Sequence, residues 1–376
     1  MDSAEREGLR PKGNVPNLRF PEFEGEWEKC KLGDASEFSK ERVNTQNLSS
    51  DNYVATENML QDYQGFIEAS SVPTNTNVVK FNKGDVLLSN IRPYLKKVWF
   101  ADKNGGCSAD VFVFKALSAC IPDFLHYIIA NDRFINFAMS GAKGVKMPRG
   151  DKEQMKTYEI GLPSIEEQKK IATLLQLLDE RIATQNKIID KLQSLIKGIR
   201  HDIFNDIQGE VLALSNIADI YQPQTISSSD LTTEGYWVYG ANGIIGKYKE
   251  YNHETEQICI TCRGNTCGTV NYTQPKVWIT GNSMVINTDK YQRQVNKRFL
   301  FHYLSSYNFN SIVSGSGQPQ IVRTPLEKIK VVLPTIEKQV RIANSIDIVS
   351  EKIDTESLVL RLLENQKQYL LRQMFI

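Results

Sequence analysis

The sequence predicts an α+β protein in which two mixed α/β modules are separated by an antiparallel two-helix coiled coil, with an internal pseudo-two-fold duplication. Three observations support this fold class: two long heptad patterns, a repeat that relates them, and strand-like runs before each pattern. At 376 residues the chain has room for two or three globular units. Its 41% hydrophobic and 24% charged residues are typical of an ordinary soluble protein.

Residues 1–24 are expected to form an N-terminal tail. The first residues contain no apolar core, so they do not resemble a signal peptide. No apolar run approaches the roughly 20 residues of a membrane span. The six cysteines lack paired framework spacing, which favours a reducing compartment. We therefore expect a cytoplasmic protein without membrane association.

The first globular module is expected at residues 25–163. It combines strand signals with one helix-like segment and ends in a loop rich in Gly and Lys. The strand-like runs are 77–81, 86–88, 97–100 and 111–114, the helical spacing covers 124–137, and the loop is 141–150.

A central helix is expected at residues 164–205. Its apolar residues recur in alternating steps of four and three, the heptad pattern of a long helix that packs on another helix. Ser164 and Glu167 have the spacing of a capping box. Roughly 40 helical residues span about 60 Å. The seam residues of this helix include Ile171, Leu175, Leu178, Ile182, Ile189 and Leu192.

The module and the helix occur twice. A second module is expected at residues 209–333 and a second helix at 334–376, which aligns without a gap on the first at a constant offset of 171 (333 − 162). Agreement outside the heptad seam makes duplication the better explanation. The second seam includes Ile342, Ile346, Val349, Ile353, Leu360 and Leu363.

The lengths of the connections predict the topology of the two helices. The second helix starts near the end of the first and must bury its own seam, so we expect it to fold back antiparallel. Polar Gln185 interrupts the first seam, and Glu356 interrupts the second at the same offset. We expect this pair near the middle of the coiled coil, where it fixes the register.

No catalytic or cofactor motif in the sequence is complete. Residues 240–248 resemble a phosphate loop, but they have one residue too many between the outer glycines and Tyr where Mg²⁺ needs Ser or Thr. Cys259 and Cys262 have zinc-like spacing, yet residues three apart on a strand face opposite sides. Glu167 to Lys169 matches only the end of a nuclease motif. We therefore expect no catalysis, metal site or cofactor in this chain.

Polar, basic and aromatic residues gather instead on loops of both modules. Arg and Asn read guanine and adenine bidentately, and Lys binds phosphate. Each residue alone could be an ordinary solvated loop residue, but two such modules favour a ligand with two separated contact patches, such as duplex DNA. A net charge of +1 neither indicates nor excludes this role. The candidates in module one are Ser89, Asn90, Arg92, Tyr94, Lys96, Lys97, Lys143, Lys146 and Arg149. The candidates in module two are Tyr239, Asn242, Lys247, Arg263, Asn265, Gln318, Gln320 and Arg323.

The chain resembles the specificity subunit of type I restriction–modification systems over almost its whole length. The resemblance is carried by the two Leu-Pro-[Ser/Thr]-Ile-Glu-x-Gln helix starts at 162 and 333 and by the repeated order of module and helix. The module openings at 27–35 and 212–218 and the segments 84–92, 238–243 and 314–318 agree with it. The 141–150 loop departs from the Ser- and Gly-rich form at 314–318, which puts the equivalent contact of module one in doubt.

This resemblance implies a role in DNA recognition. Each module would be a target recognition domain for one half of a bipartite, asymmetric DNA target. The coiled coil would set the spacer between the halves, and its seam residues would dock two modification (methyltransferase) subunits. Those subunits would carry S-adenosylmethionine, and restriction (translocase/endonuclease) subunits would carry ATP and Mg²⁺. A self-contained methyltransferase or nuclease, and a coiled-coil scaffold without DNA contact, remain as alternatives.

Overall fold

The computed structural model describes residues 13–241, 243–315 and 317–376, and it divides into two compact units. Unit 1 comprises Met1–Thr184 and Leu360–Ile376, and unit 2 comprises Gln185–Val359. Each unit contains one module and parts of two long helices, α6 (Ile165–Asp206) and α9 (Ile336–Gln373). The predicted combination of mixed α/β modules with paired long helices is confirmed.

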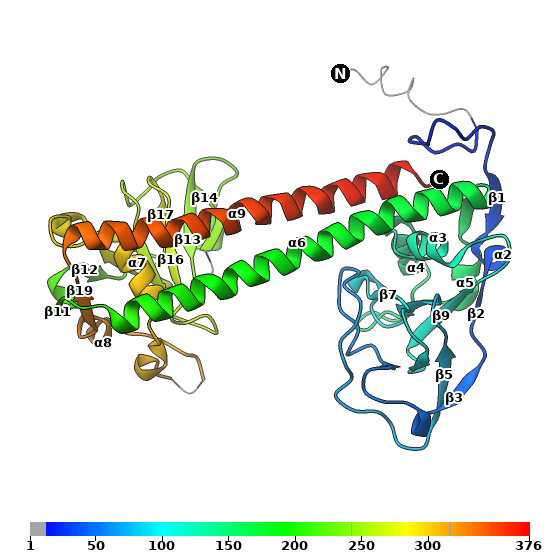
Figure 1. Ribbon diagram of the computed structural model, residues 1–376, viewed down its shortest axis with the longest axis horizontal. Coiled ribbons are helices and arrows are strands. Elements are labelled where there is room, and N and C mark those ends of the chain that lie inside the picture. The colour runs from blue at the N-terminus through cyan, green and yellow to red at the C-terminus, as the bar shows by residue number, and fades with distance from the viewer. Residues whose placement is uncertain (1–12, 242, 316) are drawn as a thin grey trace. The chain divides into compact units, whose positions relative to one another are not determined.

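Within unit 1, the first part of α6 lies antiparallel to the last part of α9 (Figure 1). Ile171 and Leu175 share a buried core with Met374. Further along α6, the Asp179 carboxylate pairs with Lys367 Nζ at 2.5 Å. These contacts show that α6 and α9 run antiparallel within unit 1.

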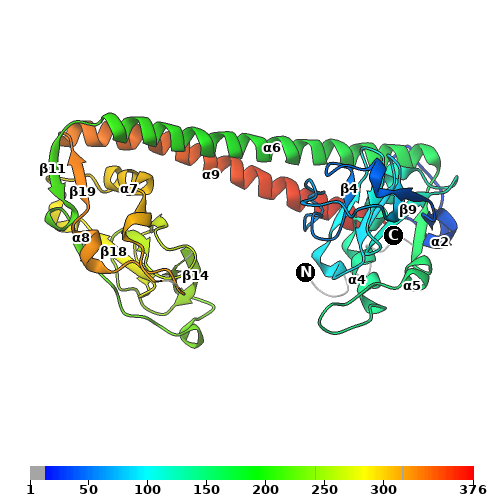
Figure 2. The same cartoon turned by 90° about the horizontal axis from the view of Figure 1, so that it is seen from below.

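The same order holds within unit 2, where the two helices again lie side by side (Figure 2). Gln185 Nε2 donates to the main-chain carbonyl of Glu356 at 3.0 Å and also to its carboxylate. Further along α6, Arg200 is linked through His302 to Asp347 of α9. The two polar interruptions of the seam therefore meet each other, as the heptad alignment predicts.

The predicted seam residues are all withdrawn from solvent, at least in part. Those that are buried are Ile171, Leu175, Leu178, Ile189, Ile346 and Leu363. Those that are half-buried are Ile182, Leu192, Ile342, Val349, Ile353 and Leu360. Because these side chains are withdrawn from solvent, a partner protein would have to meet other faces of α6 and α9.

Module one contains two four-stranded sheets and one strand pair. The first sheet has the order β2 (Ser36–Phe38), β9 (Val111–Ala116), β6 (Val86–Ser89), β7 (Val98–Phe100). The second has the order β3 (Arg42–Asn44), β5 (Asn77–Phe81), β8 (Gly105–Cys107), β4 (Tyr53–Val54). The pair β1 (Glu28–Lys31) and β10 (Glu159–Leu162) is antiparallel and leads directly into α6.

The helices of module one pack on the first sheet and on the long helices. They are α2 (Leu32–Ala35), α3 (Pro122–Ile129), α4 (Asp132–Ser140) and α5 (Lys152–Lys156). The prediction of one continuous helix over 124–137 is wrong, because Asn131 caps a new helix and its side chain accepts the N–H of Arg133 at 3.0 Å. The apolar period continues across this break, so the pattern does not reveal it.

Module two is built in the same way from a four-stranded sheet, a three-stranded sheet and one strand pair. The four-stranded sheet has the order β12 (Asp219–Tyr221), β18 (Ser283–Asn287), β15 (Ile258–Thr261), β16 (Val270–Tyr272). The three-stranded sheet has the order β14 (Gly243–Tyr248), β13 (Tyr236–Gly240), β17 (Trp278–Ile279). The strand pair β11 (Glu210–Ala213) and β19 (Lys330–Leu333) leads into α9, and the module helices are α7 (Lys297–Ser306) and α8 (Arg323–Glu327).

The first long helix does not begin with the predicted capping box. Ser164 Oγ accepts the N–H of Glu167 at 3.3 Å, which is one half of the box. The Glu167 carboxylate instead pairs with the Arg19 guanidinium at 2.7 Å and accepts from the Trp27 indole at 3.3 Å. A charge-assisted bond is stronger than a bond to a neutral N–H, so the cation takes the carboxylate.

Gln168, from the repeated helix start, joins α6 to module one. Its Oε1 accepts the N–H of Ile121, the N-cap of α3, at 2.9 Å. Its Nε2 donates to the carbonyls of Ala119 and Pro163 at 2.9 and 3.0 Å. The Gln168 side chain is fully buried, and its bond to the Pro163 carbonyl is buried as well.

Gln339 makes the corresponding bonds in module two. Its Oε1 accepts the N–H of Asn296, the N-cap of α7, at 2.8 Å. Its Nε2 donates to the carbonyls of Gln294 and Pro334, both at 2.9 Å. The glutamine of the repeated motif therefore connects a module helix to a long helix in each unit.

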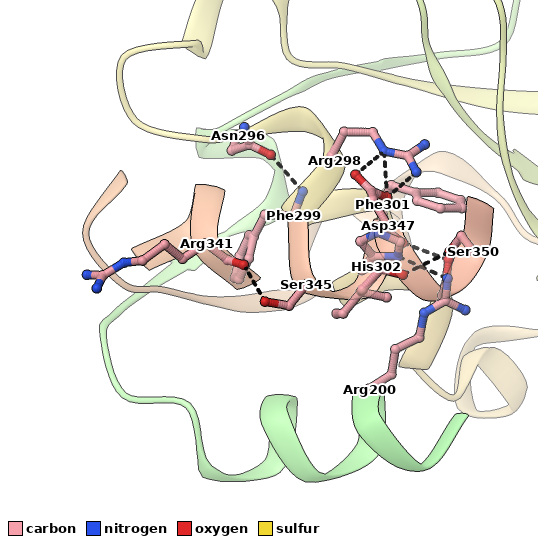
Figure 3. A network of polar contacts seen from close by, with 12 residues as sticks. Arg200, Asn296, Arg298, Phe299, Phe301, His302, Arg341, Ser345, Asp347 and Ser350 are labelled. Carbon is pink, nitrogen blue, oxygen red and sulfur yellow. Dashed lines mark hydrogen bonds and ion pairs between the residues drawn. The ribbon is translucent and has the colours of Figure 1, made fainter. Parts of the chain in front are cut away.

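A buried polar network adds a second connection in unit 2 (Figure 3). Arg200 donates to His302 Nδ1 at 2.9 Å, and His302 Nε2 contacts Asp347 at 2.7 Å. Arg298 pairs with the same carboxylate and lies 5.1 Å from the Phe301 ring. Burial lowers the pKa of His302 to about 4, so the ring is neutral at pH 7, accepts from Arg200 and donates to Asp347.

Candidate nucleic-acid interface

Module one carries a hairpin at residues 143–149, which we call the module-one hairpin. At its base, Lys143 and Arg149 exchange two main-chain hydrogen bonds of 2.9 Å. The chain that follows β6 holds the hairpin from the side, because Arg92 N donates to Pro148 O at 2.8 Å. The end of a core strand thus fixes the direction of an exposed loop.

Module two carries a hairpin at residues 314–320, the module-two hairpin, of which residue 316 lies outside the described residues. Ser314 and Gln320 exchange two main-chain hydrogen bonds of 2.8 Å. The chain that follows β15 holds it, because Gly264 N donates to Pro319 O at 3.0 Å. The attachment is the same as in module one.

The two hairpins correspond at the offset of 171 that also relates the long helices. Gly144 and Gly315 occupy the same position and have φ values of 97° and 93°, in the left-handed region that favours glycine. Met147 stands where module two has Gln318. The 141–150 loop therefore departs from the 314–318 segment in its side chains, while its main-chain hydrogen bonds match those of the described residues of the module-two hairpin.

A cleft of about 460 Å³ opens beside the module-one hairpin. Its charged lining residues are Arg92, Lys97, Glu57 and Asp110, and Met147 of the hairpin adds an apolar wall. The remaining lining residues are Tyr53, Ala55, Thr56, Ile91, Leu95 and Ser108. A cleft with donors, acceptors and an apolar wall suits the edge of a nucleobase.

Two basic candidates at this cleft already have partners. Lys97 Nζ donates to the Thr56 carbonyl at 2.6 Å, and burial lowers the pKa of Lys97. Arg149 pairs with Asp110 at 3.3 Å. These contacts orient both cations at the rim of the cleft.

The other basic candidates of module one are more exposed. Lys143 pairs with Asp151 at 2.9 Å and Lys96 with Asp132 at 2.8 Å, while Lys146 is exposed on the hairpin. Surface ion pairs contribute at most about 1 kcal/mol, so a phosphate can replace such an acid.

The remaining candidates of module one differ in their access to solvent. Ser89 is fully buried, and its Oγ donates to the Ile91 carbonyl at 3.1 Å, so it shapes the turn and does not face a ligand. Tyr94 is 48% exposed. Asn90 Oδ1 is buried and has no hydrogen-bond partner among the described residues.

A cleft of about 340 Å³ lies beside the module-two hairpin, and Gln320 of the hairpin lines it. The predicted residues Arg263, Gln320 and Arg323 line it. The other lining residues are Tyr221, Gln222, Cys262, Met284, Ile321 and Val322. None of the described lining residues is acidic, although Glu327 pairs with Arg323 at 2.7 Å. Gln318 is exposed on the hairpin above.

The other candidates of module two do not gather at this cleft. Tyr239 is 8% exposed and packs with Cys259 in the core, so its prediction as a contact residue is not supported by its position. Lys247 on β14 places its Nζ 4.8 Å from the ring centroid of Trp237 on β13. Asn265 is exposed, and Asn242 lies outside the described residues.

Sequence reasoning missed Asp110 and Met147 at the first cleft and Gln222 at the second. Asp110 and Met147 are neither basic nor amide residues, and Gln222 lies outside the glycine-rich segments of module two. Met147 can be identified as a candidate only when the two hairpin sequences are aligned at the offset of 171, because it then occupies the position of Gln318.

The weaker motifs have structural explanations. Cys259 and Cys262 belong to different core clusters, so they lie on opposite sides of the sheet. Of the described residues in the glycine-rich run at 240–248, Gly240 ends β13 and Gly243–Tyr248 form β14, which pairs antiparallel with β13. Within the described part of the chain, no three His, Cys, Asp or Glu residues are grouped to hold a metal, and no helix there is long and apolar enough to cross a membrane.

Comparison with known proteins identifies the arrangement. A specificity subunit of the type I restriction enzyme EcoprrI from Escherichia coli is 29% identical over 156 residues, which is 40% of this chain and 37% of that protein. The MjaVIII specificity subunit from Methanocaldococcus jannaschii is 26% identical and aligns with 90% of this chain and 88% of its own length. A solved type I S subunit from M. genitalium shares the fold, with a TM-score of 0.66 at 18% identity over 96% of this chain and 99% of that chain. The family model for the type I restriction modification DNA specificity domain matches residues 24–194 and 207–365, once for each module and helix, and the chain therefore belongs to this family.

Proposed function

We propose that this chain is the DNA sequence-recognition subunit of a type I restriction–modification complex. Each module binds one half of a bipartite target, and the helix pair sets the number of unread base pairs between the halves. The observation that carries the proposal is the same main-chain hairpin in each module, at the offset of 171 that also relates the long helices, with a cleft lined by arginine beside each hairpin.

Different side chains at equivalent positions support an asymmetric target. The module-one hairpin presents Met147 and Arg149, whereas the module-two hairpin presents Gln318 and Gln320. An amide can pair bidentately with adenine, and an arginine can do so with guanine. The same backbone frame would therefore read different bases in the two half-sites.

The long helices also present apolar residues that the seam does not use. Leu177 on α6 is 59% exposed in unit 1, and Ile348 on α9 is 68% exposed in unit 2. The two positions are related by the repeat offset (348 − 177 = 171). Large exposed apolar residues on helices that already bury another face favour a further protein contact. Their equivalence supports two modification subunits, one for each unit.

In this proposal the chain itself is not catalytic. The modification subunits carry S-adenosylmethionine and methylate the DNA, and the restriction subunits carry ATP and Mg²⁺. Six free cysteines favour the reducing cytoplasm as the place of action. A net charge of +1 predicts weak DNA binding by the isolated chain, so partners would supply many phosphate contacts.

Selection from a random duplex library by the complex of this chain with its modification subunits tests the proposal. We expect enrichment of two short fixed elements separated by a constant unread segment. Enrichment of no sequence would contradict DNA recognition and favour the scaffold alternative. Calorimetry of the purified chain with S-adenosylmethionine should show no binding, whereas tight binding would support a self-contained methyltransferase.

A further inference from the structure

Arg92 has a backbone conformation that residues with a Cβ rarely adopt. Its φ of 51° and ψ of 62° lie in the left-handed region. The equivalent residue of module two is Gly264, with φ of 88°, because each donates its N–H to the proline of its hairpin. One module thus uses glycine where the other keeps an arginine in a strained conformation.

The contacts that Arg92 makes within module one do not explain why an arginine occupies this position. Arg92 Nε is buried and has no hydrogen-bond partner among the described residues. Asp110, an acid in the same cleft, is paired with Arg149. A buried N–H without a partner is costly, and backbone strain persists where function requires it. Strain and an unpaired donor in one residue indicate a ligand that accepts hydrogen bonds in this cleft.

We propose that Arg92 determines specificity in module one by binding the O6 and N7 acceptors of a guanine. This inference rests on the proposed function and assigns one base contact within it. The planar guanidinium matches this pair of acceptors, and the cleft of about 460 Å³ leaves room for a base edge beside Met147. A phosphate also offers oxygen acceptors to an arginine. Loss of a guanine contact relaxes specificity at one base pair, whereas loss of a phosphate contact weakens binding to all sequences equally.

The equivalence with Gly264 supplies a variant that should fold. Arg92→Gly places in module one the residue that module two has at this position, so we expect normal thermal unfolding. In the assembled complex, discrimination at one guanine of the module-one half-site should fall about 5-fold to 150-fold, while the other half-site is unchanged. Arg92→Lys keeps the charge and can still donate to both acceptors, but without the rigid planar guanidinium, so it should show a smaller loss of discrimination at the same guanine. Arg42→Ala removes an exposed cation that does not line the cleft and serves as the control.

Binding of the assembled complex to duplexes with single substitutions in each half-site separates the outcomes. Loss of discrimination at one guanine by Arg92→Gly, with a smaller loss at the same guanine by Arg92→Lys, supports the proposal. A uniform weakening on all sequences that Arg92→Lys restores would show a phosphate contact and overturn it. Unchanged discrimination in Arg92→Gly, with sequence preference retained in both half-sites, would overturn this assignment alone. Absence of any sequence preference in the wild-type complex would instead contradict the proposed function.

Discussion

Gln168 and Gln339 make the same three hydrogen bonds, each in its own unit of the chain. Each accepts the N–H at the start of a module helix and donates to two carbonyls. Both side chains are fully buried, and so is the bond of each to its proline carbonyl, so the loss of that bond leaves a carbonyl that water cannot easily reach. The glutamine of the repeated helix start is therefore the joint between a module and a long helix.

Replacement of either glutamine by leucine should destabilise its own unit. Gln168→Leu leaves one N–H and two carbonyls without their partner, and we expect a loss of about 2–4 kcal/mol in the free energy of unfolding. Gln339→Leu should do the same in unit 2. Urea denaturation combined with hydrogen exchange of α3 and α7 measures both effects. The control Gln176→Leu changes an exposed residue of α6, so its free energy of unfolding should stay within about 0.5 kcal/mol of wild type. An equally small effect of Gln168→Leu would contradict the role of Gln168 in connecting module one to α6.

Unit 2 should lose stability as the pH falls from 6.5 to 4. Burial lowers the pKa of His302 from its ordinary 6.5 to about 4, so in this range the unfolded chain binds a proton that the folded chain does not. Hydrogen bonds from Arg298 and His302 outweigh burial and lower the pKa of Asp347, so its stabilising charge is lost only in stronger acid.

His302→Gln should reduce this pH dependence. At pH 5 the histidine accounts for about 2 kcal/mol of lost stability relative to neutral pH. Burial also lowers the pKa of His126 to about 3 and of His253 to about 4, so part of the dependence will remain in the variant. Urea unfolding at pH 7.5 and pH 5 measures the difference. Identical pH dependence in both proteins would show that His302 does not titrate as described.

Gln318→Ala should relax only the half-site that module two reads. A bidentate amide–adenine pair contributes about 1–3 kcal/mol of discrimination, and its loss should allow other bases at one position. Met147→Ala, the equivalent change in module one, is the matched variant and should affect only the other half-site. Mapping of methylated adenines in cells that express each complex provides the measurement. A change in both half-sites by either variant would be inconsistent with independent modules.

Leu177→Lys and Ile348→Lys should each remove one modification subunit from the complex. A charge on an exposed apolar residue opposes its burial in an interface without disturbing the helix seam. Native mass spectrometry should show one bound subunit for each single variant and none for the double variant. Gln176→Lys, at an exposed neighbouring position, should retain two. Two subunits on the double variant would exclude this face as the docking surface.

The helix pair could be predicted because its heptad pattern is long and occurs twice. A seam that must be buried fixes which helix faces meet, and the offset of 171 predicts that Gln185 meets Glu356. The strand at Asn77–Phe81 was predicted with its observed limits because turn residues bound a short apolar run.

The equivalence of the hairpins could not be predicted from side chains. It depends on main-chain hydrogen bonds and on Gly144 and Gly315, which tolerate different neighbours. The pairing of Glu167 with Arg19 joins residues 148 positions apart, so local spacing suggested a cap instead. The residue type of Tyr239 suggested a DNA contact, but its side chain is buried in a core cluster with Cys259.

Insertion of one heptad into both long helices tests the central claim most directly. Seven residues added after Thr184 and after Thr355, which are related by the repeat offset, keep the seam in register and lengthen each helix by about 10 Å. Methylated adenines are then mapped in cells that express the complete modification complex. We predict the same two half-sites with an unread spacer that is longer by about three base pairs, at 3.4 Å per base pair. Methylation with the original spacer would contradict the proposal that the helix pair sets the distance between two DNA-reading modules.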